Sequence, residues 1–246
     1  MADPEIPADL RRLWRLRASS KLGRTPELDV DQVVRAAVSL AGRDGLEGVT
    51  LQKVAQELGF TKMSLYRHIG SKDDLFELMA DHATGPAPSL DADLGWRGKV
   101  RQWAAATRER YAEHPWLIDI PMSGPPRGPN AVGWMDALLE ALHDTGLDLG
   151  TQAGVLTVIS GYLRNSITLT RQFEERTGLS QAQVEENYGR ALGTLVTPDR
   201  FPNAARLFAV SVFEPEASGG TAAEREFSFG LELIMDGVAA AIERGS

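Results

Sequence analysis

The stretch Val49–Met79, VTLQKVAQELGFTKMSLYRHIGSKDDLFELM, decides the fold, because it places two short helical segments on either side of one tight turn. Ala55, Gly59 and Leu65 have the spacing of a helix-turn-helix. The small alanine lets two helices cross closely, the glycine supplies a left-handed turn residue, and the leucine anchors the second helix on the first. We therefore expect helices at Thr50–Leu58 and Thr61–His68.

The flanking sequence supports this motif with two further helices. Apolar residues recur at helical spacing over Val30–Ala41, where Asp29 and Gln32 can form a capping box, and the glycines of Gly42–Gly48 are expected to end this helix. Ser71 is placed to cap a following helix with an apolar face. A motif supported on both sides is a much stronger signal than its three-residue pattern alone.

Charge is distributed unevenly along the chain. The net charge is −8, from 26 basic and 34 acidic residues. Two stretches nevertheless contain basic residues and no acid: Leu10–Pro26, and Leu58–Lys72 within the motif. Because electrostatic fields act over about 8 Å at physiological salt, such local stretches can attract a polyanion although the whole chain is acidic. Solvated surface charge is the alternative interpretation.

The remainder of the chain predicts a second helical part after a linker at Thr84–Gly95, which is rich in proline and glycine. No period-two strand pattern is convincing, so the expected fold class is all-α. Capping boxes at Ser180–Gln183 and Thr221–Glu224 support two of the expected helices. The expected long helices are Trp96–Glu113, Asn130–Asp144, Asp148–Thr177, Ser180–Val196 and Glu224–Glu243.

Composition and motif searches exclude several classes of protein. The chain has no cysteine, which removes disulfides and thiolate metal sites. No nucleophile elbow, phosphate-binding loop or dinucleotide fingerprint occurs, and the four histidines lack ligand spacing, so we expect neither an enzyme, nor a cofactor, nor a metal. The acidic start and the absence of a long apolar stretch predict a cytoplasmic protein without a membrane segment.

The motif resembles the DNA-binding domain of the tetracycline-repressor (TetR) family of bacterial regulators. The matching residues are Thr50, Ala55, Leu58-Gly59, Leu65-Tyr66-Arg67-His68 and Ser71-Lys72, and the stretch His114–Asn130 is similar to the C-terminal domain of tetracycline repressors. The resemblance implies a homodimer that binds double-stranded operator DNA, usually as a repressor, and is released by a small-molecule effector. A C-terminal domain that binds a protein partner, or nothing, is the alternative. The expected parts are a basic extension (1–28), a three-helix DNA-binding domain (29–84) and a helical ligand-binding and dimerisation domain (96–246).

Helical geometry sorts the second helix of the motif into two faces. Leu65 and Ile69 lie 40° apart and define its buried face, so Arg67 points away from the core toward a DNA major groove. The family resemblance implies base contacts from Gln52, Lys62, Met63 and Ser64, and backbone contacts from Tyr66, His68 and Lys72. The alternative for Thr50 is a role as a helix cap alone, and the alternative for His68 is a role in capping or packing alone. The expected DNA-binding residues are Thr50, Gln52, Thr61, Lys62, Met63, Ser64, Tyr66, Arg67, His68 and Lys72.

Two parts of the chain leave alternatives open. The basic extension is either a flexible arm that enters the minor groove or a short helix that packs through Leu10, Leu13 and Trp14. In the C-terminal part, tryptophans cluster as in an aromatic-lined pocket, although core packing is the better explanation for any one of them. The candidate effector contacts are Trp103, Trp134, Tyr162, Asn165 and Phe173. The faces of the long C-terminal helices could serve either the pocket or a four-helix dimer bundle.

Overall fold

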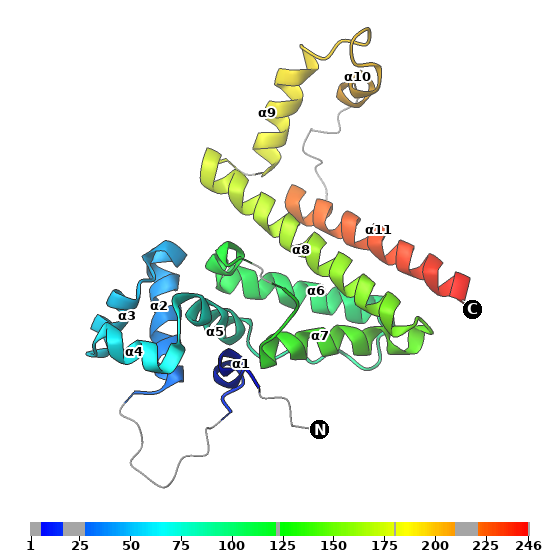
Figure 1. The fold of residues 1–246 in the computed structure, drawn as a ribbon. Coiled ribbons are helices and arrows are strands. Elements are labelled where there is room, and N and C mark those ends of the chain that lie inside the picture. The colour runs from blue at the N-terminus through cyan, green and yellow to red at the C-terminus, as the bar shows by residue number, and fades with distance from the viewer. Residues whose placement is uncertain (1–5, 17–27, 122–123, 180, 210–220, 246) are drawn as a thin grey trace. The chain divides into compact units, whose positions relative to one another are not determined.

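The computed structural model describes residues 6–16, 28–121, 124–179, 181–209 and 221–245 (Figure 1). Within these ranges the regular structure is helical throughout, with no strand, which confirms the expected all-α fold. The chain divides into two compact units, Met1–Thr145 and Gly146–Ser246.

The first unit contains the helix-turn-helix and the helices that support it. Its elements are α1 (Ala8–Leu13), α2 (Val30–Gly48), α3 (Leu51–Leu58), α4 (Lys62–Ile69), α5 (Lys72–Thr84), α6 (Trp96–Glu113), η1 (Pro115–Asp119), α7 (Pro129–Leu142) and η2 (His143–Thr145). The helices α3 and α4 are the two helices expected from the motif, each displaced by one residue or less at its ends.

The motif's three key residues have the roles that their spacing predicts. Ala55 and Leu65 are buried in one hydrophobic core. Gly59 ends α3 in the left-handed conformation, with φ 74° and ψ 22°. Because a residue with a Cβ rarely adopts this conformation, glycine makes the short turn possible. The capping box at the start of α2 is also confirmed: Asp29 accepts from the backbone of Gln32, whose side chain accepts from Asp29 in return.

The end of α2 lies within the expected stretch, Gly42–Gly48. The helix continues through Gly42 to Gly48, and only Gly45 leaves helical geometry, with φ 69° and ψ 176°. A glycine weakens a helix without forcing it to end, and here the backbone uses glycine's freedom once, at a kink.

The helices after the expected linker pack on the motif's own core. Residues 85–95 contain no helix, as predicted for a linker. Trp116 and Leu117 of η1 nevertheless belong to the same buried cluster as Leu65 and Ile69. As a result, the boundary between the compact units lies at Thr145/Gly146 rather than at the linker.

The second unit is built on α8 (Leu149–Thr177) and α11 (Ala222–Gly245), which pack side by side, together with α9 (Gln181–Gly193) and α10 (Pro202–Phe208). The expected capping box before α11 is confirmed by reciprocal hydrogen bonds between Thr221 and Glu224. The box at Ser180 lies outside the described residues. The helix α10 has only seven residues and was not expected from the sequence.

Candidate nucleic-acid interface

The outward face of α4 is exposed along its length, whereas its inward face is closed. Leu65 and Ile69 have no exposed surface. Met63 on the opposite side is 70% exposed, and Arg67 is exposed as well. A short helix of this kind, fixed by two buried residues and open on the other side, has the geometry of a helix that enters a major groove.

The ten expected DNA-binding residues all lie on α3, α4, their N-caps and the first turn of α5, within the first unit. Eight side chains are exposed and two, Ser64 and His68, are half-buried. The exposed residues are Thr50, Gln52, Thr61, Lys62, Met63, Tyr66, Arg67 and Lys72.

Two of these residues cap the helices of the motif. The hydroxyl of Thr50 accepts from the backbone N–H of Lys53 at 3.2 Å, and that of Thr61 accepts from Ser64 at 3.2 Å. The hydroxyls of Thr61 and Ser64 also lie 3.0 Å apart. These side chains therefore fix the starts of α3 and α4, and a contact to DNA would have to be made in addition to the cap.

The cations of this face are available to an anion. Lys62 lies over the ring of Tyr66 and Lys72 over that of Phe76, with ammonium-to-centroid distances of 5.8 and 4.9 Å. Among the described residues, no carboxylate forms an ion pair with Lys62, Arg67 or Lys72. Lys72 also lies at the first residue of α5, where exposed backbone N–H groups favour negative charge.

The start of the basic extension is a packed helix. Leu13 of α1 is 2% exposed and belongs to the core of the first unit. The indole N–H of Trp14 donates to the backbone carbonyl of Arg127 at 2.8 Å, and Arg15 pairs with Asp31 of α2 at 2.7 Å. Residues 17–27, which carry the remaining cations of the extension, lie outside the described residues, so the minor-groove arm stays a prediction for that part.

The five expected effector contacts are divided between the two units. In the first unit, Trp103 and Trp134 pack edge to face, with centroids 5.8 Å apart, and are almost fully buried. Their indole N–H groups donate to the backbone carbonyls of Trp134 and Gly85, respectively. This pair is part of the core in the structure, and its contact with an effector stays a prediction.

The other three candidates lie on α8 in the second unit. The ring of Tyr162 stacks on Phe227, and its hydroxyl donates to backbone carbonyls of α11, so it joins α8 to α11. Asn165 is exposed. The side chain of Phe173 lies outside the described residues. For all three, the role in effector binding stays a prediction.

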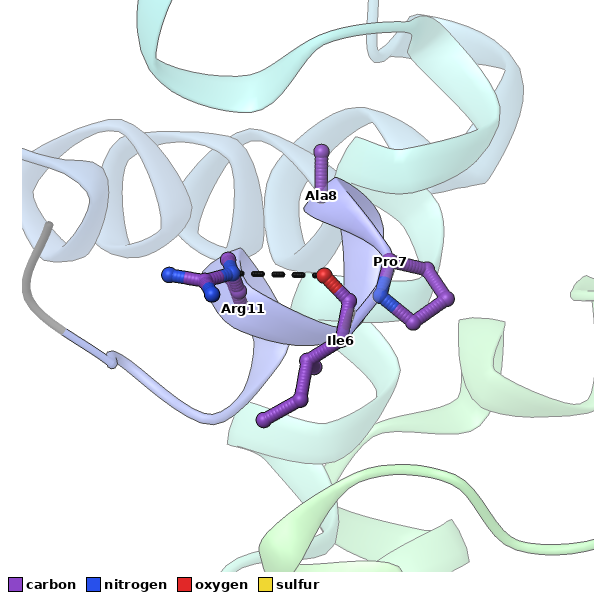
Figure 2. Close-up of a pocket in the computed structure, with 4 residues that line it drawn as sticks. All are labelled: Ile6, Pro7, Ala8 and Arg11. Atoms are coloured by element: carbon purple, nitrogen blue, oxygen red, sulfur yellow. Dashed lines mark hydrogen bonds between the residues drawn. The ribbon is translucent and has the colours of Figure 1, made fainter. Parts of the chain in front are cut away.

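A hollow beside the start of α1 shows no feature of a ligand site. It is lined by Ile6, Pro7, Ala8 and Arg11 (Figure 2), and it is open to solvent. The Nε of Arg11 donates to the carbonyl of Ile6 at 3.2 Å, within the same short segment. Within the described ranges, no cluster of metal-ligating side chains occurs and no helix is long and apolar enough to span a membrane.

Three ion pairs around α1, α5 and α7, and the burial of Asp81, could not be predicted from the sequence. Arg12 pairs with Asp74, and Arg127 pairs with both Asp9 and Glu77. Their partners are separated by 50 to 118 positions in the sequence, so no local pattern relates them.

Comparison with known proteins covers both units. Residues 33–79 match the family described as "Bacterial regulatory proteins, tetR family", and residues 87–242 match "Tetracyclin repressor-like, C-terminal domain". The HTH-type transcriptional repressor DrrR1 of Streptomyces coeruleorubidus is 33% identical over 95% of this chain and 86% of that protein. The class A tetracycline repressor from transposon 1721 of Escherichia coli is 28% identical over 87% of this chain and 91% of that protein.

A solved structure of the same fold is ActR of Streptomyces coelicolor in complex with actinorhodin. It superimposes with a TM-score of 0.72 at 24% identity, covering 88% of this chain and 98% of that chain. At this identity the likeness concerns the fold, and it extends over both compact units.

Proposed function

This chain belongs to the TetR family of bacterial transcriptional regulators, and from that premise we propose that it is a repressor that binds a palindromic operator as a homodimer and is released by a small-molecule effector. The proteins that match it are transcriptional regulators, which confirms that the chain is not an enzyme. The proposal concerns its operator, its oligomeric state and its control.

The observation that carries the proposal is the outward face of α4. The exposed face holds Lys62, Met63 and Arg67, which can reach base edges, while Leu65 and Ile69 fix the helix from behind. Arginine and lysine donate to guanine in the major groove, and an apolar side chain such as methionine suits the methyl group of thymine. The capped start of α5 adds a phosphate anchor at Lys72.

A second copy of the chain is supported by exposed apolar residues on α8 and α11. Val158 and Leu169 on α8, and Phe229 and Leu233 on α11, have between 41% and 71% of their surface exposed. The first half of α8 also carries no charged residue up to Leu163. Two neighbouring helices with such faces can form a four-helix bundle with the same helices of another protomer. One three-helix DNA-binding domain by itself buries too little surface for tight, specific binding to DNA.

A small-molecule effector is supported by the C-terminal match and by the ActR complex. Residues 87–242 match a tetracycline-repressor-like C-terminal domain, and ActR, of the same fold, is known in complex with actinorhodin. We expect a largely apolar effector, with Trp103, Trp134, Tyr162, Asn165 and Phe173 as candidate contacts.

The operator can be identified with the purified full-length chain. Binding sites are selected from a pool of random double-stranded DNA and then mapped by footprinting. We expect two protected half-sites in inverted orientation, read by recognition helices about 34–36 Å apart, as for two successive major grooves. One protected half-site bound by a monomer would contradict the homodimer, and a failure to select any sequence would contradict specific DNA binding.

A further inference from the structure

The end of the recognition helix α4 lies directly against an ion pair from two other helices. Gly70 follows α4 with φ 83°. A Cβ added to Gly70 would overlap both the guanidinium of Arg12, from α1, and the carboxylate of Asp74, from α5. The corner between α4 and α5 is therefore closed around these two side chains: the backbone conformation favours glycine there, and any other residue would displace the ion pair.

The ion pair at this corner is short and partly buried. Nη2 of Arg12 donates to Oδ2 of Asp74 at 2.5 Å, and the two side chains are 27% and 25% exposed. The Nε of Arg12 is buried and has no hydrogen-bond acceptor among the described residues. Because desolvating that N–H group without a partner is costly, the bond to Asp74 is what holds the guanidinium in this position.

Both sides of the pair are held by further contacts. On the side of α5, the backbone N–H of Asp74 donates to the hydroxyl of Ser71, the N-cap of the helix. On the side of α1, Leu13 is inserted in the core next to Arg12. An ion pair between two fixed elements transmits position, whereas a pair between flexible side chains only neutralises charge.

The helix α1 is also bonded to the segment before α7. The guanidinium of Arg127 pairs with Asp9 of α1 and, at 3.3 Å, with Glu77 of α5. The carbonyl of the same residue accepts from the indole of Trp14. The helix α1 is thus held by Arg127 through Asp9 and contacts the α4–α5 corner through Arg12.

We propose that Arg12 is a positioning residue for the recognition of the operator. The helix α1 supports the corner between α4 and α5, and the Arg12–Asp74 pair sets the angle between these two helices. This inference rests on the proposed function, since it assumes that α4 reads DNA. The helix α4 has only eight residues, so its direction depends on what holds its ends. Its start is held by the Thr61 cap, and its end is held at Gly70 by the pair.

A residue that orients the recognition helix and a residue that only contributes positive charge have different effects on sequence preference. A cation that only attracts phosphates strengthens the binding of every duplex equally. A residue that aims the recognition helix strengthens the binding of the correct sequence and leaves unrelated DNA almost unaffected, because base-edge contacts need the right orientation. The ratio of the two affinities therefore separates the two roles.

The test compares Arg12→Ala with Arg11→Ala in the full-length protein. Arg11 is a matched control because it lies on the same helix and carries the same charge, and its side chain donates, among the described residues, only to Ile6 in its own segment (Figure 2). Dissociation constants are measured for the selected operator and for an unrelated duplex at one salt concentration. We expect Arg12→Ala to lower the affinity ratio about tenfold, the size of one lost base-pair preference. Arg11→Ala should leave the ratio within about twofold.

Two further variants keep the inference falsifiable. Asp74→Asn preserves the shape of the partner and should lower the ratio as Arg12→Ala does. The double variant Arg12→Ala with Asp74→Asn should be no worse than either single change, because both remove the same interaction. Each dissociation constant is calculated for the concentration of folded protein, which is measured by circular dichroism. A loss of stability then does not change the ratio of the affinities for operator and unrelated DNA.

The inference is overturned if Arg12→Ala and Asp74→Asn keep the wild-type ratio. It is also overturned if Asp74→Asn restores the affinity of the Arg12→Ala protein, because Arg12 would then only neutralise a carboxylate near the DNA. Either result leaves the proposed function intact, provided the wild-type protein selects an operator. If the wild-type protein selects no sequence, it is the proposed function that fails.

Discussion

Asp81 of α5 caps α7 across a gap of fifty positions: its carboxylate accepts from the backbone N–H of Ala131 at 3.0 Å. The side-chain amide of Asn130 donates to the same carboxylate at 3.2 Å and to the backbone carbonyl of Asp81 at 2.9 Å. Asp81 is only 8% exposed, and its carboxylate occupies the space that a Cβ on Gly128 would need. The helix that follows the recognition helix is therefore joined to α7 by a buried polar contact.

Replacing Asp81 with alanine should destabilise the protein. The substitution leaves the helix-terminal N–H of Ala131 without its acceptor and leaves the amide of Asn130 only the backbone carbonyl at position 81, which costs about 1–3 kcal/mol of unfolding free energy. Urea denaturation followed by circular dichroism measures the change. Asp136→Ala, on the exposed side of α7, is the matched control and should stay within about 0.5 kcal/mol of wild type. Equal stability of the two variants would show that the cap contributes nothing.

The titration of Asp81 should make the free energy of unfolding depend on pH. Burial raises the pKa of Asp81 above the ordinary value of 3.8, and the hydrogen bonds from Ala131 and Asn130 oppose the effect only in part. The folded state therefore holds the proton more tightly, so the linked stability is fully present below pH 3.8 and is lost as the pH rises through the folded pKa.

The measurement compares wild type with Asp81→Asn, which does not titrate at this position. The unfolding free energy of wild type relative to the variant should fall as the pH is raised from about 4 to 7, by about 1.4 kcal/mol for each unit of pKa difference. Other ionisable groups cancel in the comparison. A difference that stays constant or grows with pH would mean that burial does not control this carboxyl group.

The parts of the fold set by local sequence could be predicted, and those set by distant contacts could not. The spacing of Ala55, Gly59 and Leu65 predicts a turn from eleven consecutive residues, and the structure agrees with it. The pairing of Arg12 with Asp74 joins positions 62 apart, and only the folded chain shows it. The boundary between the compact units was likewise set by packing, since η1 joins the core of the motif although a proline-rich linker precedes it.

Arg67→Ala and Lys72→Ala should weaken DNA binding in different ways. If Arg67 reads a guanine edge, its loss costs roughly 1–3 kcal/mol on the selected operator and relaxes the preference at one base pair. Lys72→Ala should weaken every duplex about equally and lower the slope of log affinity against log salt by about one. Titrations of operator and unrelated DNA at several salt concentrations measure both effects. Equal losses on the two duplexes for Arg67→Ala would assign Arg67 to the phosphates.

Leu233→Glu should break the dimer and with it the binding of the full operator. Leu233 lies on α11 with 62% of its surface exposed, and a glutamate buried between two copies would have no partner. Analytical ultracentrifugation should show monomer where wild type is dimer. Leu195→Glu is the control, because Leu195 is 70% exposed but follows α9 and belongs to neither α8 nor α11. If Leu233→Glu stays dimeric, the interface lies elsewhere.

Induction should be reciprocal between effector and operator. If an effector lowers operator affinity by some factor, thermodynamic linkage requires the operator to lower effector affinity by the same factor. A coupling of about 1–3 kcal/mol is enough, which corresponds to a 5- to 150-fold change. The buried contact between Asp81 and the start of α7 gives one physical route, since any movement of α7 acts on the helix that follows the recognition helix.

Candidate effectors are found by the rise in melting temperature that ligand binding causes, and are then titrated by calorimetry with and without the selected operator. Equal affinity in both titrations would show that the ligand site does not control DNA binding, and a protein partner of the C-terminal domain would then be the better hypothesis.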